Sequence, residues 1–441
     1  MLSDSWLLAA VAVLLGTWVV LEIAVRLYVG RPLRTDFYGS IARSAVREHQ
    51  ARYGVQVAAG VGWAHLGWIA DPERERYRIE RQEAGASRVI GYAQFGSYLV
   101  RATGTYRVWA EPHDGSPPRL LGHVGVEVEP AVAPLSVPRI AGPWQPLFRP
   151  TTAGDYINDH TIYQDAAGDW RVVGITAKGD GNYAEETHFA VGVSPDFPPA
   201  AGMREVARVA DFGELAWAPH VIAEAGTYYL FWSPHRLHRM TSPDGIDWQG
   251  HHVVIEEPFH KFFRDAMVLK VGPGQWLLYA TARAAYFSSI DVYQSFDLEG
   301  WQYIGSALRT GWGSERNAIV ASTESPAVVA YRGRYYLSVT YNNDSFFWSA
   351  VLLPLKIWLA PSSYNDTLIF HADTPYDFGI YRGRKRTSSL LTRLQAHAPE
   401  FVHDPQRDAW YITTAGWPWV STLTAGEVAV APLRWEPGDR E

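Results

Sequence analysis

The sequence predicts an all-β protein, with a five-bladed β-propeller, a small β-sandwich ahead of it and one N-terminal transmembrane helix. Three observations support this prediction. One motif recurs five times between residues 158 and 413, alternating strands fill residues 55–130, and an uncharged apolar stretch occupies residues 5–21. A chain of 441 residues is long enough for two or three domains.

The propeller is predicted from the spacing of the repeated motif. In each copy an apolar stretch leads to a turn, and an aromatic residue opens a strand 11 residues after the first position. The first positions are Asp159, Trp217, Asp265, Glu324 and Pro399, and the aromatic residues are Trp170, Tyr228, Trp276, Tyr335 and Trp410. These aromatic residues are 58, 48, 59 and 75 residues apart, about the length of a four-stranded blade with its loops. The spacing therefore predicts a propeller over residues 144–441.

Three copies carry an acid at the first position, namely Asp159, Asp265 and Glu324. If each copy forms one sheet around a common axis, equivalent positions meet at that axis. Chemistry that cleaves glycosidic bonds uses such convergent carboxylates. A second interpretation stays open, because an Asp at the start of a strand also caps turns by accepting backbone N–H bonds.

Residues 55–130 alternate between apolar and polar positions with turn residues between the runs, which is typical of an antiparallel sandwich. The segment Gly104–Ala110 resembles the late strand of a fibronectin type III module, so an immunoglobulin-like or fibronectin-like sandwich is expected. Pro134 and Pro138 fall in residues 131–143, which we expect to form a stiff linker to the propeller.

The N-terminal region is expected to be a membrane anchor over residues 1–30, followed by a neck over residues 31–54. The apolar stretch resumes after Glu22, and about 20 apolar residues span a bilayer as a helix. A cleaved signal peptide is the alternative, but no Lys or Arg precedes the stretch and no small-residue cleavage site follows it. As an anchor, residues 5–28 would contact lipid. Five arginines follow the stretch by residue 47, so the positive-inside rule predicts a single-pass inner-membrane protein with a cytoplasmic globular part.

Over residues 144–437 the propeller resembles the five-bladed glycoside hydrolases of families 32, 43, 62 and 68. Asn158-Asp159, Arg264-Asp265 and Glu324-Ser325-Pro326 resemble the three acidic motifs of these enzymes, in the same order. Trp217-Ala218-Pro219-His220 looks like the second blade of family 43. The first two motifs depart from the family pattern, because His160 and Ala266 replace proline.

The resemblance implies roles for these residues. Asp159 would be the nucleophile or the base, and Glu324 the general acid. Asp265 would hold a sugar hydroxyl and raise the pKa of Glu324. Arg264, Trp217 and His220 would contact the substrate. The implied function is a membrane-anchored glycoside hydrolase or transglycosylase that acts on a glycan or a small sugar.

Composition excludes other classes. The chain has no Cys, so thiol nucleophiles and thiolate metal sites are excluded, and its net charge of −7 argues against a nucleic-acid partner. His235 and His238 lack an acid at helical spacing, so no metal site is predicted, and no cofactor is expected either. One functional alternative stays open, namely a non-catalytic accessory subunit of a larger membrane complex, for example photosynthetic or respiratory, that uses a retired hydrolase propeller.

Overall fold

The computed structural model describes residues 38–438 apart from 84, 210–211, 257–261, 285–286, 311–321, 343–363, 382–388 and 420, together with residues 13, 16 and 17. Among the residues so described, no helix has the length and apolar character needed to cross a membrane. Apart from those three residues, the predicted anchor and its lipid-contacting range 5–28 lie outside the described part of the chain.

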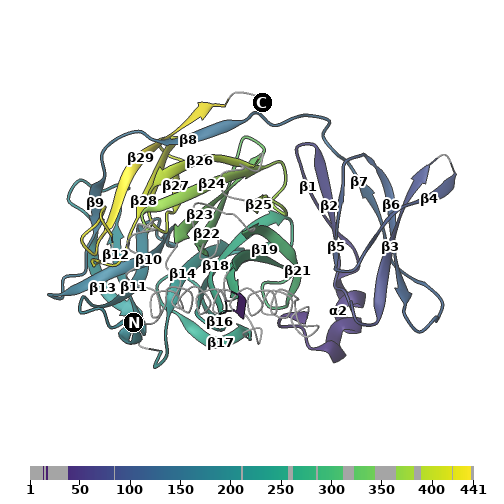
Figure 1. Ribbon diagram of the computed structural model, residues 1–441, viewed down its shortest axis with the longest axis horizontal. Coiled ribbons are helices and arrows are strands. Elements are labelled where there is room, and N and C mark those ends of the chain that lie inside the picture. The colour runs from purple at the N-terminus through teal and green to yellow at the C-terminus, as the bar shows by residue number, and fades with distance from the viewer. Residues whose placement is uncertain are drawn as a thin grey trace, which may run out of the picture.

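Five sheets form the larger body of the molecule, at the left of Figure 1, and each of the first four is an antiparallel meander of the kind found in propellers. We call them blades 1 to 5 in chain order. Blades 1 and 2 comprise β10 (Asp155–Gln164), β11 (Trp170–Lys178), β12 (His188–Ser194), β13 (Arg204–Val209), β14 (Trp217–Glu224), β15 (Thr227–Ser233), β16 (Leu237–Ser242) and β17 (Gln249–Ile255). Blade 3 comprises β18 (Phe262–Gly272), β19 (Gln275–Ala284), β20 (Phe287–Ser295) and β21 (Trp301–Thr310), with β25 (Gly379–Tyr381) parallel to β21. Blade 4 comprises β22 (Ser322–Tyr331), β23 (Arg334–Asn342), β24 (Asp366–Ala372) and β26 (Leu390–Gln395).

Apolar cores fill each of the five junctions between neighbouring blades. Val173 and Ile175 of blade 1, for example, pack with Leu230 and Trp232 of blade 2. Equivalent cores join blades 2 and 3, 3 and 4, 4 and 5, and 5 and 1. The second strand of a blade is covered on both faces, which explains why β11 is apolar along most of its length. The predicted ring of five blades is therefore closed by side-chain packing.

The last blade is completed by a strand from the region expected to be a linker. Blade 5 comprises β27 (Phe401–Asp404), β28 (Ala409–Thr414), β29 (Val428–Pro437) and β8 (Ser136–Ile140), and β9 (Gln145–Phe148) also pairs with β29. The expectation that residues 131–143 form only a linker is therefore wrong. Pro138 is tolerated because β8 is an edge strand, where a missing N–H leaves no partner unpaired.

The first seven strands form two facing sheets, at the right of Figure 1. One sheet has the order β1-β2-β5 and the other β4-β3-β6-β7. Their bounds are β1 (Gln56–Gly60), β2 (Trp63–Gly67), β3 (Glu75–Glu83), β4 (Ala86–Ala93), β5 (Ser97–Val100), β6 (Gly104–Pro112) and β7 (Arg119–Val126). Alternate residues point inward, and Leu66, Trp68, Ile79 and Val108 are fully buried between the sheets.

The neck and the two-sheet unit dock on blade 3. The neck contains η2 (Arg43–Ala45) and α2 (Val46–Tyr53), and η3 (Tyr183–Glu185) lies in blade 1. Gln302 of β21 donates to the carbonyl of Ala70 at 2.8 Å and accepts from its N–H at 2.6 Å. Gln294 of β20 donates to the carbonyl oxygens of Trp68 and Gly96. Two buried amide side chains thus satisfy backbone groups across this junction.

Candidate active site

The first strand of each of blades 1 to 4 is interrupted by a β-bulge near the centre of the propeller. The strand pairing shifts at Asn158/His160 in β10, Trp217/His220 in β14, Arg264/Met267 in β18 and Glu324/Ala327 in β22. Ala218, Asp265, Ser325 and Ala398, the last just before β27, have φ between 43° and 57°. This left-handed backbone costs a non-glycine residue about 1–2 kcal/mol. Bulges of this kind re-aim side chains, here toward the common centre.

The positions of the bulges show that Glu324 is not the structural counterpart of Asp265, although the 11-residue spacing implied that it was. Asp159 and Asp265 both lie in the bulge, but the bulge residue of blade 4 is Ser325. Glu324 is the last paired residue before the bulge of blade 4, and the residue at this position in blade 3 is Arg264. The difference arises because β18 has a second irregularity, between Lys270 and Gly272, that lengthens its hairpin by one residue.

Arg264 joins two of the predicted acids. Its Nη2 donates to Oε2 of Glu324 at 2.7 Å, and its Nε lies 3.2 Å from Oδ2 of Asp265. All three side chains are nearly buried, with 8, 13 and 3 % of the surfaces of Arg264, Glu324 and Asp265 exposed. The predicted substrate contact Arg264 is therefore an internal cation that neutralises neighbouring acids.

Asp159, the remaining predicted acid, is linked to the same network through blade 4. The N–H of Ser325 donates to Oδ2 of Asp265 at 3.0 Å, and its hydroxyl donates to Oδ1 of Asp159 at 3.4 Å. Nε2 of His397 lies 3.6 Å from the same Asp159 oxygen, while its Nδ1 contacts the carbonyl of Tyr364 at 2.9 Å. Both nitrogens of His397 face acceptors, which favours the imidazolium. Burial lowers its pKa, but Asp159 and Glu324 outweigh burial and the net pKa is raised.

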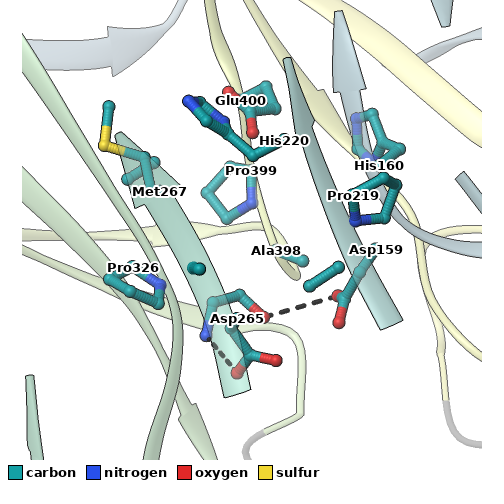
Figure 2. Close-up of a pocket in the computed structure, with 14 residues that line it drawn as sticks. Asp159, His160, Pro219, His220, Asp265, Met267, Pro326, Ala398, Pro399 and Glu400 are labelled. Atoms are coloured by element: carbon teal, nitrogen blue, oxygen red, sulfur yellow. Dashed lines mark hydrogen bonds between the residues drawn. The ribbon is translucent and has the colours of Figure 1, made fainter. Parts of the chain in front are cut away.

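A cavity of about 30 Å³ lies between the first strands. Figure 2 shows Asp159 and Asp265 at one end and His220, Met267 and Glu400 at the other. This volume holds one or two waters and is far below the ~300 Å³ of a typical ligand pocket. His220 lines this cavity, contacts the carbonyl of Val268 at 3.2 Å, and has its pKa lowered to about 4 by burial.

Two carboxyls at the cavity have raised pKa values. Burial, together with the charges of Asp159 and Glu324, raises the pKa of Asp265 to about 7 against the opposing effect of Arg264. Burial and the charge of Asp159 raise the pKa of Glu400 to about 8. At neutral pH the cavity therefore holds a protonated carboxyl on Glu400, which is the protonation state that a general acid needs.

A fifth carboxyl, Glu186, lies on the aromatic side of the site. It accepts hydrogen bonds from the hydroxyl of Tyr156 and from Nε1 of Trp417, and burial raises its pKa to about 7. A series of stacked rings leads from the centre to solvent, with centroid distances of 3.8, 6.0 and 5.6 Å. The rings are those of His397, Tyr364, Trp417 and Trp419. Trp419 is exposed, so this series offers an aromatic surface next to the carboxylates.

Of the six residues predicted for the site, three line the cavity and two more, Arg264 and Glu324, belong to the network beside it, with different contacts from those expected. Asp159, Asp265 and His220 line it, and Glu324 lies next to Ser325, which does. Trp217 is half-buried beside Tyr183, with ring centroids 6.3 Å apart. Glu400 and Glu186 were missed. Glu400 follows Pro399 in the fifth copy and could have been found there, but Glu186 precedes β12, outside the repeated motif.

No family model matches the chain, and no curated protein matches it. Solved structures with a similar fold include a GH32 β-fructofuranosidase from Bombyx mori, which is 12 % identical over 67 % of this chain and 63 % of its own, with a TM-score of 0.48. A thermostable family-43 glycoside hydrolase is 15 % identical over 67 % of this chain and 97 % of its own, with a TM-score of 0.44. A sucrose-6-phosphate hydrolase from Lactobacillus gasseri is 14 % identical over 68 % and 62 %, with a TM-score of 0.48. This chain spans less than two thirds of the length of the first and third of these proteins, and the likeness is one of fold.

Proposed function

We propose that this chain is a membrane-anchored, glycoside hydrolase-like protein that cleaves or transfers a glycosyl group through Asp159, Asp265 and Glu324. One observation carries the proposal, namely that acids from three separate blades meet in a single hydrogen-bonded network around Arg264 and Ser325. Glycosyl transfer needs one carboxylate to attack or to activate water and one carboxylic acid to protonate the leaving oxygen.

The roles follow from the contacts of each acid. Asp159 lines the cavity and keeps part of its surface accessible, so it is assigned as nucleophile or base. His397, with its Nε2 3.6 Å from Oδ1 of Asp159, helps to hold this carboxyl in place. Glu324 is the acid implied by the family resemblance, and Glu400, with its raised pKa, is a second proton donor at the same cavity. Asp265 is the residue that binds a sugar hydroxyl.

Hydrolysis assays on the full chain in detergent test this proposal with fructosides, arabinosides and xylosides. Asp159→Asn and Glu324→Gln are expected to lower turnover by about 10²–10⁴-fold, the usual contribution of acid–base catalysis. Glu224→Gln serves as the matched control, because Glu224 of blade 2 pairs with Lys270 of blade 3 on the surface. Absence of turnover from folded protein would exclude these substrates and favour the second candidate below.

Substrates with different leaving groups distinguish the two candidate general acids, Glu324 and Glu400. The aryl group of an activated aryl glycoside leaves without being protonated, so the variant that lacks the general acid keeps its activity on the aryl substrate and loses it on a disaccharide. Glu324→Gln and Glu400→Gln are compared in this way. The variant that loses both activities equally removes a residue with another role.

The second candidate is a non-catalytic accessory subunit of a larger membrane complex. It is favoured by the way Arg264 holds Asp265 and Glu324 in buried ion pairs, which leaves these acids fewer oxygens for a substrate. Mild-detergent extraction followed by size measurement of the native assembly tests it. Migration far above the size of the chain in its micelle supports the subunit, and migration at that size argues against it.

Membrane attachment is also part of the proposal. Residues 5–28 are proposed to span the bilayer once, with the globular part in the cytoplasm, because the apolar stretch is followed by arginines. The two-sheet unit is proposed to be a fibronectin type III-like module, supported by its orders of three and four strands. Carbonate extraction of membranes tests the anchor, and protease protection of sealed vesicles tests the orientation.

A further inference from the structure

A cluster of two histidines and one glutamate lies on the outer strands of blade 2, away from the central acids. His238 belongs to β16, His251 to β17, and Glu214 to the loop before β14. One ligand atom from each lies within 4.8 Å of the other two. Nδ1 of His238 is 3.0 Å from Nε2 of His251 and 3.8 Å from Oε1 of Glu214. These three residues come from separate segments of the chain, so the fold and not the local sequence brings them together.

We propose that Glu214, His238 and His251 bind one divalent transition-metal ion, with Zn²⁺ as the ion that these ligands suit best. Imidazole nitrogens and a carboxylate oxygen are its usual ligands, at about 2.0–2.2 Å. Tetrahedral ligands at that bond length are about 3.3 Å apart. The two nitrogens are within a few tenths of an ångström of this separation, and the exposed Glu214 needs only a small side-chain movement to reach it.

Aromatic packing holds the two imidazoles in position before the ion arrives. Trp232 stacks on His238 with centroids 5.2 Å apart and planes inclined by 14°, and it packs on His251 at 5.0 Å. Phe212 stacks on Trp232, with ring centroids 4.5 Å apart, and packs edge-on against His251 at 5.9 Å. Trp232 and His238 are buried, so the inner side of the site is fixed by the core of the blade. A pre-organised first shell of this kind favours tight binding.

The outer side of the site is open to solvent. Glu214 and His251 are exposed, which gives an ion an entry path and leaves a fourth position for water. An ion held there would tie the loop before β14 to β16 and β17, and it would stabilise this blade by mass action. Three protein ligands with an open position are also the arrangement found in catalytic zinc sites. The sequence predicted no metal site, because Glu214 and His251 are 24 and 13 residues from His238.

Zinc binding by the chelator-treated full chain tests this inference. Titration of Zn²⁺ against a chromogenic chelator gives stoichiometry and affinity, and the absorption spectrum of the Co²⁺ form reports the coordination. We expect one ion per chain, a tetrahedral Co²⁺ spectrum and an increase in thermal stability. His251→Gln and Glu214→Gln should each weaken binding about tenfold or more, because each removes one protein ligand. Both residues are exposed, so these variants leave the core intact.

His252→Gln is the matched control. His252 neighbours His251 on the same strand, but its Nδ1 contacts the carbonyl of Gly250 and its Nε2 lies 3.7 Å from Glu299. This variant should bind zinc like the wild type. Absence of stoichiometric binding, unchanged affinity in His251→Gln, or equal weakening in His252→Gln would each overturn the assignment. The chain has no Cys, so thiolates do not compete for the ion.

Discussion

Arg264→Met is the most informative perturbation of the central network. The guanidinium bridges Asp265 at 3.2 Å and Glu324 at 2.7 Å, and only 8 % of the Arg264 side chain is exposed. Methionine replaces much of the aliphatic volume of arginine but carries no charge. The substitution therefore leaves two acids, 3 and 13 % exposed, without their common cation.

The expected cost follows from this burial. Removing one partner of a buried ion pair lowers the free energy of unfolding by about 3–5 kcal/mol, because the remaining charge stays desolvated. Domains are stable by only about 5–15 kcal/mol. Asp265 already has a raised pKa in the wild type and takes up a proton readily, so most of the cost falls on Glu324. We therefore expect a loss near 3 kcal/mol at neutral pH, at the lower end of that range.

Urea unfolding of the full chain at pH 8 and pH 5 measures this loss. Unpaired buried carboxylates have folded pKa values above their unfolded values, so their penalty is fully present above the folded pKa and fades as the pH falls toward the unfolded pKa. The loss should thus be smaller at pH 5 than at pH 8. Arg393→Met is the control, because Arg393 pairs with Asp366 on the surface and its loss should cost less than about 1 kcal/mol. A loss below 1 kcal/mol for Arg264→Met, or equal losses at both pH values, would refute the reasoning.

Three further predictions concern single side chains. Glu400→Gln should raise the free energy of unfolding at pH 9 by at most about 5 kcal/mol and leave it unchanged at pH 4, because burial raises the pKa of Glu400 from 4.5 to about 8 and so penalises only the carboxylate. No gain at pH 9 would contradict this. His397→Gln should cost more stability at pH 5.5 than at pH 9, since its raised pKa stabilises the fold below the unfolded pKa and that stability is lost as the pH rises through the folded pKa; equal melting-temperature losses at both pH values would argue against the Asp159 pair. Gln302→Ala should lower the free energy of unfolding by about 2 kcal/mol, because the N–H and carbonyl of Ala70 lose their partner; chemical unfolding that matches the wild type would show that water replaces the amide.

The repeat predicted from the sequence identified the blades because it rests on a property that strands share. An aromatic residue that opens a strand packs between blades, and Trp170, Trp276 and Trp410 all do so. The position of β8 could not be predicted in the same way. Strand β8 pairs with residues nearly 300 positions later, and its partners in β29 come to lie beside it only when the ring closes. Pro138 in this segment signalled a linker, although proline is equally at home in an edge strand.

The sequence predicted which acids lie at the centre, but it did not predict their contacts. The spacing treats Glu324 as the equivalent of Asp265, whereas the extra residue near Val271 in β18 shifts the register by one. Such bulges depend on how the hairpin twists against its neighbours, and no residue type in this segment predicts them. The left-handed backbone at Asp265 and Ser325 was equally hidden, because glycine is absent from both positions. Contacts in a site of this kind therefore depend on single-residue insertions that a motif search does not register.

The charges at the centre give a physical reason to prefer the hydrolase over the scaffold. Arg264 compensates Asp265 and Glu324, and His397 compensates Asp159. Within the part of the chain that the structure describes, no cation offsets Glu400, which stays neutral by binding a proton. Burying ionisable groups in this way lowers the stability of the fold, and apolar side chains of similar volume at the same positions would lower it less. Perturbed carboxyls gather where chemistry uses them. Asp159, held beside His397, and a protonated Glu400 line one cavity. This arrangement suits the two carboxyl roles of glycosyl transfer, and ion-pair packing alone does not call for it.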